Sequence, residues 1–237
     1  MIKQITFITL FIFDYFHKKR IIKFIKKNLG ISSIELFLDI GAHKGESIDF
    51  FSNNLKIKKI ISFEASPINF EILKKKYYNK KNLIIENKAL SSKEDIKIFN
   101  QCDESSSSTF SEINESSKYL KKKMNFLNIS KVENFFSKQT IKTVPLEKYL
   151  DDNNINKVDI IKIDTEGHEF EILKGLKTSI KKIDVIIFEH HYDNMIKKNY
   201  TFFEINNFLK KNSFIKVFKI KMPFRKSFEY IYVKNIQ

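Results

Sequence analysis

Cysteine, glycine, proline and tryptophan are all scarce in this sequence, and the scarcity of cysteine excludes the most. The chain has 237 residues and one cysteine, Cys102, so it can form neither an intramolecular disulfide framework nor a cysteine-rich zinc site. Structural disulfides belong to oxidising compartments. We therefore expect a cytoplasmic protein, either free or at the inner face of the membrane.

The rest of the composition is that of one globular domain of generous size, with or without an extension. Hydrophobic residues make up 42% and charged residues 30% of the chain, ordinary values for a protein that buries a core. These values exclude a disordered tail protein and a collagen-like repeat.

A net charge of +15 would ordinarily indicate a nucleic-acid or membrane partner. Arginine, however, occurs only as Arg20 and Arg225, so all the other basic residues are lysines. Lysine, isoleucine, asparagine and phenylalanine are abundant here and share A/T-rich codons, so genome composition explains much of the excess. Lysine is also less suited than arginine to recognising bases and to binding phosphates. We therefore interpret the charge as a solvated surface and expect no nucleic-acid partner.

The N-terminus begins with an apolar run over residues 5–16. This run is shorter than the roughly 20 apolar residues of a membrane-spanning helix. A signal peptide would have its charges first, whereas here the basic run 17–20 follows and apolar residues continue at helical spacing toward Gly30. The pattern predicts an amphipathic N-terminal helix in an extension of residues 1–33. This helix either packs on the domain, which we favour, or makes a peripheral contact with a membrane surface.

From residue 34 onward, short apolar runs alternate with segments of helical spacing. This alternation predicts an α/β domain over residues 34–237, with a doubly wound, mainly parallel sheet and helices on both faces. The expected strands are residues 35–40, 59–64, 83–89, 96–99, 159–164, 184–189, 214–220 and 228–234, the last two forming an antiparallel pair. Residues 101–140 contain no clean strand, so we expect a flexible insertion there, either a lid or an enlarged surface loop.

Acidic residues stand where several of these strands end. Asp39 and Glu64 end the first two strands, and Asp164 and Glu189 end two later ones, with Glu166 just beyond Asp164. In a doubly wound sheet, ligands bind at the carboxyl ends of the strands. These acids therefore predict a ligand site at that edge of the sheet.

The turn after the first strand indicates what the ligand is. Gly41 and Gly45 flank this turn, and glycine there permits a positive φ and close approach of the backbone to a ligand. Glu64 follows Gly41 at about the 20-residue offset of an acid that binds ribose hydroxyls. An adenosine-containing ligand is therefore expected. The alternative is a tight turn with a solvated acid nearby.

The spacing of this turn also distinguishes between nucleotides. Residues 41–45 match neither the G-x-G-x-x-G of a dinucleotide site nor the G-x-x-x-x-G-K-[ST] of a P-loop. Asp39 would suit an ammonium group rather than a phosphate. S-adenosylmethionine carries adenosine, an α-ammonium and a sulfonium, so it fits this acidic rim better than NAD does.

Four segments together resemble a known family: FLDIGAHKG at 37–45, FEASP at 63–67, NKAL at 87–90 and IKIDTEGHE at 161–169. They look like the motifs of FkbM-family methyltransferases, and the likeness extends over roughly residues 35–191. The resemblance implies a class I, Rossmann-like methyltransferase fold with a seven-stranded sheet and S-adenosylmethionine as cofactor. It also implies O-methylation of a hydroxyl on a sugar, a glycan or a similar small metabolite.

The resemblance suggests roles for residues at this edge. Asp39 is expected near the ammonium group and Glu64 at the ribose, while Asp164 and Glu166 face the methyl end. The full set of expected cofactor-binding residues is Asp39, Gly41, Ala42, Gly45, Glu64, Ala65, Asn87, Ala89 and Asp164. The remaining requirements of methyl transfer are alignment of the acceptor and a base for its hydroxyl proton.

The sequence leaves the identity of that base open. The candidate catalytic residues are Asp164, Glu166, His168 and His190, with His191 as an alternative to its neighbour. Histidine exchanges a proton near neutral pH, although His168 could simply start a helix. Mg²⁺ held by Asp164, Glu166 and Glu189 is another alternative. Carboxylates close together are more often structural or ligand-binding, so we expect no metal.

Two other classes of function are compatible with the sequence. An RNA methyltransferase would bind nucleic acid with a steep salt dependence, but no appended basic or zinc module supports one. A non-catalytic module that keeps the fold would not bind S-adenosylmethionine. The partner that the motifs favour is a small-molecule or glycan acceptor.

Overall fold

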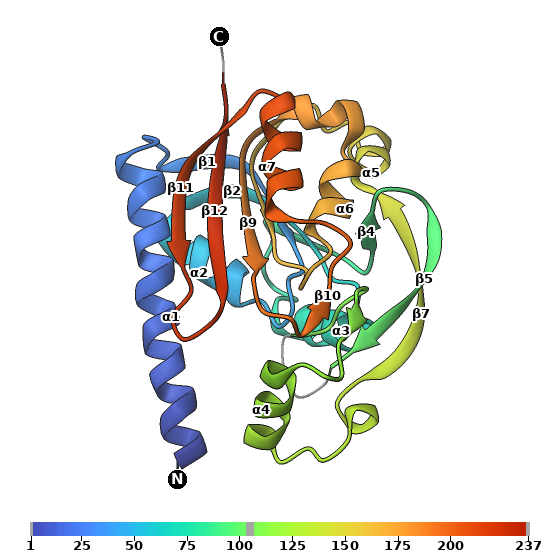
Figure 1. Ribbon diagram of the computed structural model, residues 1–237. Coiled ribbons are helices and arrows are strands. Elements are labelled where there is room, and N and C mark those ends of the chain that lie inside the picture. Colours follow the sequence, from blue (N-terminus) through green and yellow to red (C-terminus); the bar gives the residue numbers. More distant parts are fainter. Residues whose placement is uncertain (1, 103–106, 236–237) are drawn as a thin grey trace.

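A seven-stranded sheet forms the centre of the computed structural model, which describes residues 2–102 and 107–235 (Figure 1). The strand order is β11-β12-β9-β8-β1-β2-β3. Its strands are β1 (Ser33–Ile40), β2 (Lys56–Phe63), β3 (Leu83–Glu86), β8 (Val158–Ile163), β9 (Ile183–His191), β11 (Phe214–Lys221) and β12 (Ser227–Lys234). Neighbours are parallel except β12, which is antiparallel to both β9 and β11. The predicted doubly wound, mainly parallel α/β fold is confirmed.

Two smaller sheets lie beside the main one. One has the order β4-β7-β5 and the other pairs β10 with β6. Their strands are β4 (Ala89–Ser91), β5 (Asp95–Gln101), β6 (Glu112–Ile113), β7 (Ser137–Pro145) and β10 (Ile196–Lys197). The short β4 runs parallel to β7, and the longer β5 runs antiparallel to it.

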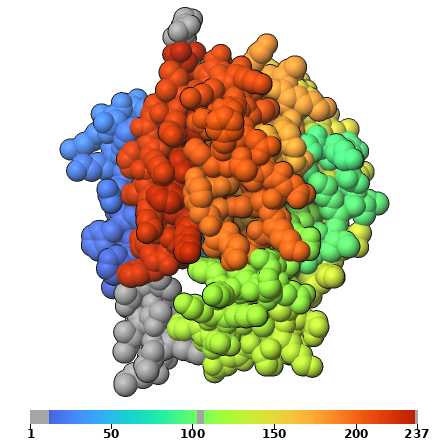
Figure 2. All heavy atoms as spheres, viewed as in Figure 1, coloured from blue at the N-terminus to red at the C-terminus, as the bar shows by residue number. Residues whose placement is uncertain are grey.

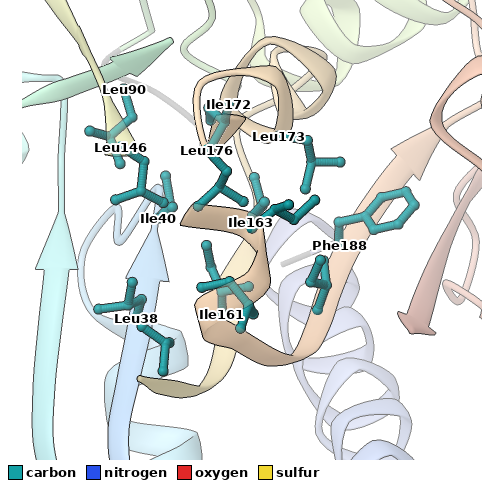
Figure 3. Packing of buried hydrophobic residues seen from close by; sticks show 14 of the residues in the cluster. Leu38, Ile40, Leu90, Leu146, Ile161, Ile163, Ile172, Leu173, Leu176 and Phe188 are labelled. Atoms are coloured by element: carbon teal, nitrogen blue, oxygen red, sulfur yellow. The ribbon is translucent and has the colours of Figure 1, made fainter. Parts of the chain in front are cut away.

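Helices cover both faces of the main sheet (Figure 1). They are α1 (Ile2–Lys27), α2 (Glu46–Asn54), α3 (Pro67–Lys76), α4 (Lys118–Leu127), α5 (Leu146–Asp152), α6 (Glu169–Lys174) and α7 (Phe202–Lys211), with 3-10 turns η1 (Val132–Asn134) and η2 (Lys177–Lys182). Leu38, Ile161 and Phe188 point into the core on the side of α5, α6 and α7 (Figure 3). Their neighbours Phe37 and Ile160 are buried on the opposite side, with residues of α1 and α2. The strands are apolar on both faces because both faces are covered.

Local sequence explains where two of the helices begin. The Ser66 hydroxyl accepts a hydrogen bond from the Asn69 backbone N–H at 3.2 Å, and Pro67 stands at the first position of α3. Thr201 and Glu204 form a reciprocal capping box at the start of α7. The first of these caps fixes the direction of the chain just after Glu64.

The expected single strand over residues 83–89 is wrong. The chain leaves the main sheet after Glu86, and β4 belongs to a different sheet. Asn87 stands between the two, and its side-chain amide donates to the Glu64 carbonyl oxygen at 2.8 Å. Residues 86–88 are Glu, Asn and Lys, and this side-chain bond of Asn87 accompanies the break between the two strands.

Residues 101–140 contain regular structure, contrary to the expectation of no clean strand. The segment includes β6, α4 and η1, and β7 begins within it at Ser137. Figure 2 shows α4 and its surroundings, in green, as a lobe at the lower end of the molecule. Ile96 and Ile98 on β5, the partner of β7, are exposed, so this ribbon lacks the buried apolar runs by which the other strands were recognised. That the segment acts as a lid stays a prediction.

The predicted N-terminal helix is present as α1. Its last two turns pack on the domain, because Ile21, Ile22 and Ile25 are buried in the same core cluster as Phe37 of β1. The helix ends at Lys27, and Gly30 follows with a φ of +69°. Among the helices of the described residues, none is long and apolar enough to cross a membrane.

Candidate active site

A pocket opens at the carboxyl ends of β1, β2 and β8, with about 550 Å³ of empty space, part of it open to solvent. The predicted site residues that line it are Gly41, Glu64, Ala65, Ala89, Asp164, Glu166 and His168. The sheet edge that carries the strand-end acids therefore does form a pocket. The structure brings together there the acids that follow two different strands, Glu64 after β2 and Asp164 and Glu166 after β8.

The Gly41 turn lies in close contact with the end of the neighbouring strand β8. Gly41 has a φ of +85°, and a Cβ added there would lie 1.9 Å from the backbone oxygen of Asp164. The Gly41 and Ala42 N–H groups both donate to the Phe63 carbonyl oxygen, at 2.9 and 3.1 Å. Gly45 has a φ of +89°, and Tyr77 fills the space that a side chain would need. Both glycines are therefore required by the packing of the turn.

Glu64 fixes this turn through hydrogen bonds to the backbone. Its buried carboxylate accepts hydrogen bonds from the His43 backbone N–H at 2.7 Å and from the Ser66 backbone N–H at 2.9 Å. Burial raises the pKa of Glu64 to about 7, against the opposing effect of these bonds. A carboxylate accepts about four hydrogen bonds, so Glu64 retains acceptor capacity toward the pocket that it lines.

Asp39 lies at the end of β1, fully buried. Neither of its carboxylate oxygens has a hydrogen-bond partner among the described residues. The nearby Lys162 ammonium donates instead to Asp164 at 2.7 Å. Burial raises the pKa of Asp39 to about 6, with the charge of Lys162 opposing the rise. Two unbonded buried oxygens call for a cationic or hydrogen-bonding group, as an α-ammonium would be.

The loop after β8 is held by several backbone contacts. Glu166 has a φ of +50°, unusual for a residue with a side chain, and its carbonyl oxygen accepts from the Thr109 hydroxyl at 2.6 Å. Ser111 donates to the Gly167 carbonyl at 3.1 Å, and the Glu169 carboxylate accepts from the Gly167 N–H at 2.9 Å. The start of the 101–140 segment thus fixes the loop that presents Glu166.

A cluster of charges surrounds the Glu166 side chain. His191 Nε2 lies 3.3 Å from a carboxylate oxygen of Glu166 and 3.3 Å from one of Glu189, and its Nδ1 lies 3.5 Å from Asp193. Burial alone would lower the pKa of His191, but the two glutamates outweigh it and raise that pKa well above its ordinary value. His191 is therefore an imidazolium at neutral pH, and it carries its proton already.

The other two candidate histidines differ in position. His168 lines the pocket, its Nε2 lies 3.0 Å from the Ser91 hydroxyl, and burial lowers its pKa to about 4. His190 is not among the lining residues; it is packed against the rings of Tyr192, at 4.8 Å, and Phe202, at 5.7 Å. Burial lowers the pKa of His190 to about 3. Only His168 of the two can meet a ligand in this pocket.

The remaining predicted residues support the pocket without lining it. Ala42 and Asp39 are buried beside it, Gly45 packs on Tyr77, and Asn87 bonds the Glu64 carbonyl. The sequence interpretation missed part of the wall, formed by Lys88, Leu90, Phe99, Ser108 and Phe110 among others. Lys88 and Leu90 lie within the motif at 87–90, whereas the sequence signal for Phe99 and Phe110 was a pair of phenylalanines within a polar region.

The magnesium alternative finds no support in the geometry. Among the described residues, no group of three or more histidine, cysteine, aspartate or glutamate side chains is arranged to hold a metal ion. Glu166 and Glu189 instead share the imidazolium of His191, and Asp164 is paired with Lys162. We therefore derive no step through a metal.

Comparison with known proteins identifies the fold and the family. The FkbM methyltransferase domain matches residues 39–216. The hexuronic acid methyltransferase AglP of Haloferax volcanii is 35% identical over 52 residues, which cover 22% of this chain and 22% of that protein. Thus the matched part spans only about a fifth of this relative's length.

Two solved structures share the fold at low sequence identity. Methyltransferase FkbM from Methylobacillus flagellatus KT is 14% identical, with a TM-score of 0.51, over 85% of this chain and 44% of that one. Magnesium protoporphyrin IX methyltransferase ChlM from Synechocystis PCC 6803, solved with bound S-adenosylmethionine, is 8% identical, with a TM-score of 0.52, over 94% and 81%. The strand order, the glycine turn and the family match over most of the sequence agree, and we conclude that the chain belongs to the FkbM methyltransferase family.

Proposed function

We propose that this protein transfers a methyl group from S-adenosylmethionine to a hydroxyl of a sugar, a glycan or a similar small metabolite. Family membership supports the methyltransferase activity and the cofactor that the sequence motifs predicted. The observation that carries the finer proposal is the position of Glu166. Its half-buried carboxylate lines the same pocket as Glu64.

The residues of the pocket fit S-adenosylmethionine. Glu64 would accept hydrogen bonds from the ribose hydroxyls. Asp39, which is buried beside the pocket with both oxygens unbonded, would attract the ammonium group. Phe99, Leu90 and the backbone around Ala89 would contact the adenine, which needs an apolar wall. When bound, the cofactor supplies a methyl group on a sulfonium, an electrophile that needs no further activation.

Glu166 is the residue that we assign as the general base. Burial raises its pKa above the ordinary glutamate value, although the charges of His191 and Lys123 oppose the rise. A raised pKa makes a carboxylate a better acceptor for the proton of an attacking hydroxyl. In the transfer, the acceptor oxygen would gain the methyl group as the bond between methyl carbon and sulfonium sulfur breaks, which leaves a neutral thioether. The hydroxyl proton would pass to Glu166, which His191 keeps in place.

The other candidates are poorer bases. Burial would raise the pKa of Asp164, but the ammonium of Lys162 outweighs it and lowers that pKa below the ordinary aspartate value. His168 has a pKa of about 4, so its neutral imidazole has little affinity for a proton. Among the candidate catalytic residues that line the pocket, Glu166 is thus the one whose environment favours proton uptake.

A sugar acceptor is supported by the likeness to the hexuronic acid methyltransferase AglP. The test is incubation of the protein with labelled S-adenosylmethionine and a panel of hexuronic acids, neutral sugars, host glycans, lipids and RNA. We expect label on a sugar hydroxyl, as an ether that survives alkaline hydrolysis. Label that alkali releases as methanol would mean methylation of a carboxylate, and label on RNA would favour the nucleic-acid alternative; either result would overturn the proposal.

A further inference from the structure

Helix α1 reverses its polarity in its middle turns. Over residues 12–17 the polar side chains face the protein, because Asp14 is bonded to Arg225 at 2.8 Å and the buried His17 to Glu229 at 2.5 Å. The apolar side chains of the same turns are exposed, and Phe16 is 62% exposed. These contacts with β12 and the loop before it hold the helix in this rotation, so the apolar side chains of the same turns are directed largely toward solvent.

The loop between β11 and β12 adds to this exposed surface. Phe224 has a φ of +59° and is 68% exposed, and its ring meets the Phe13 ring edge to face at 5.0 Å. We call the resulting patch the apolar tip, and its members are Ile12, Phe13, Tyr15, Phe16 and Phe224. Clusters of exposed large apolar side chains mark interaction sites rather than ordinary surface.

Exposed basic side chains follow the apolar tip along α1 and also stand on α4. On α1 the exposed Arg20 and Lys23 follow Phe16 along the helix. On α4 the exposed Lys118, Lys121 and Lys122 form a second basic group. Figure 1 shows that the loop between β11 and β12, the N-terminal half of α1, and α4 all lie at the end of the molecule toward which β9 points. The apolar tip and its lysines therefore lie at the same end as the carboxyl edge of the sheet.

We infer that the apolar tip docks on a membrane surface that contains anionic lipids. Aromatic and aliphatic side chains bordered by lysine and arginine are the pattern of interfacial membrane contacts, in which the apolar groups enter the acyl boundary and the charges stay among the headgroups. Each basic residue near an anionic surface adds to the attraction. Such a contact is peripheral, in keeping with the lack of a spanning helix among the described residues.

The contact also orients the enzyme. The pocket opens at the carboxyl ends of β1, β2 and β8, so docking through the apolar tip turns that end of the molecule toward the lipid. The inference does not depend on the identity of the acceptor, since it rests on side chains outside the pocket. It can fail while the proposed function stands.

The test is co-sedimentation of the full chain with vesicles of phosphatidylcholine alone and of phosphatidylcholine mixed with phosphatidylglycerol. We expect binding to the mixed vesicles, weaker binding to phosphatidylcholine alone, and loss of binding at high salt. The variant Phe16→Ser/Phe224→Ser should bind the mixed vesicles at least about tenfold more weakly. Arg20→Gln/Lys23→Gln should bind less tightly and with a shallower salt dependence.

The matched control is Phe203→Ser, which removes a ring that is 69% exposed on α7, outside the apolar tip. It should bind vesicles as the wild type does, and all variants should keep the wild-type affinity for S-adenosylmethionine, which shows that they are folded. No binding to the mixed vesicles, or equal loss in the control, would overturn the inference. So would a wild-type dimer that becomes monomeric in the double variant without any vesicle binding, because the apolar tip would then be a protein interface.

Discussion

The acids at the carboxyl ends of β1 and β2 are held differently from those at the carboxyl ends of β8 and β9. We call these two places the β1–β2 corner and the β8–β9 corner of the site. At the β1–β2 corner, Glu64 is fixed by two backbone N–H groups of the turn that it supports. At the β8–β9 corner, Glu166 and Glu189 share one imidazolium, and each has a buried oxygen without a hydrogen bond. Backbone bonds form once the chain is folded and do not change partners, whereas side-chain ion pairs can be exchanged when a substrate enters. In the proposed mechanism, the first corner binds the cofactor and the second takes the proton.

The largest effect is expected from a substitution at the contact between the two corners, where Gly41 approaches Asp164. We expect Gly41→Ala to abolish measurable binding of S-adenosylmethionine and to lower the free energy of unfolding by more than about 2 kcal/mol. The added Cβ would lie 1.9 Å from the Asp164 backbone oxygen, at a φ of +85°. Calorimetric titration and urea unfolding measure the two effects.

Gly30→Ala is the control for this substitution. Gly30 also has a positive φ, of +69°, but nothing lies within 4 Å of an added Cβ. The control should show only the backbone cost, about 1 kcal/mol, with unchanged binding. If the two variants behaved alike, the close approach of the Gly41 turn to β8 would play no part in binding.

The second test separates chemistry from binding. Glu166→Gln should lower kcat by about 10²- to 10³-fold, because a neutral amide cannot take the acceptor proton. The affinity for S-adenosylmethionine should change little, since the proposed cofactor contacts lie at the other corner. Glu189→Gln is the matched variant: Glu189 lies equally close to His191 but does not line the pocket, so its effect on kcat should be much smaller. Equal losses in both variants would mean that the glutamates act only by holding His191.

The smallest expected effect concerns Asp39 at the β1–β2 corner, whose carboxylate has no hydrogen-bond partner among the described residues. Burial raises the pKa of Asp39 from 3.8 to about 6, so in this window the folded protein holds a proton that the unfolded chain has lost. The contribution of Asp39 to stability therefore falls as the pH rises from about 4 to about 6. Asp39→Asn cannot ionise, so its stability relative to the wild type should increase over this window by an amount on the order of 2 kcal/mol.

Urea unfolding of both proteins at several pH values measures this difference. Groups common to both proteins, such as His168 with its lowered pKa, cancel in it. A difference that stays constant across the window would mean that Asp39 ionises as it does in the unfolded chain. Above neutral pH the difference should level off, because Asp39 is then ionised in both states.

The sequence predicted the β1–β2 corner better than the β8–β9 corner. Gly41 and Glu64 were recognisable because a turn with positive φ and an acid at a strand end are local features. His190 and His191 are neighbours on one strand, where successive side chains point to opposite faces. His191 reaches Glu166, while His190 is packed against Tyr192. The sequence of these two histidines does not indicate which face of β9 is directed toward the pocket.

The pocket wall was predictable only in part, for a similar reason. Ala89 was expected from its motif, whereas Phe99 and Phe110 come from β5 and from the segment that follows it. The β5–β7 ribbon is exposed along Ile96 and Ile98, so its sequence carries no long buried run. Its place beside β4 results from pairing between segments far apart in the chain.

By itself, the sequence determined the order of strands and helices, the glycine turn and the acids at the strand ends, because periodicity and backbone conformation are set by neighbouring residues. The tertiary structure alone decided which acids keep a proton and which side chains remain exposed. Asp39 lies beside Lys162 on the adjacent strand, and Asp14 and His17 are bonded to residues more than 200 positions away. The pKa of a buried group and the rotation of α1 depend on such distances, which only the packed chain defines.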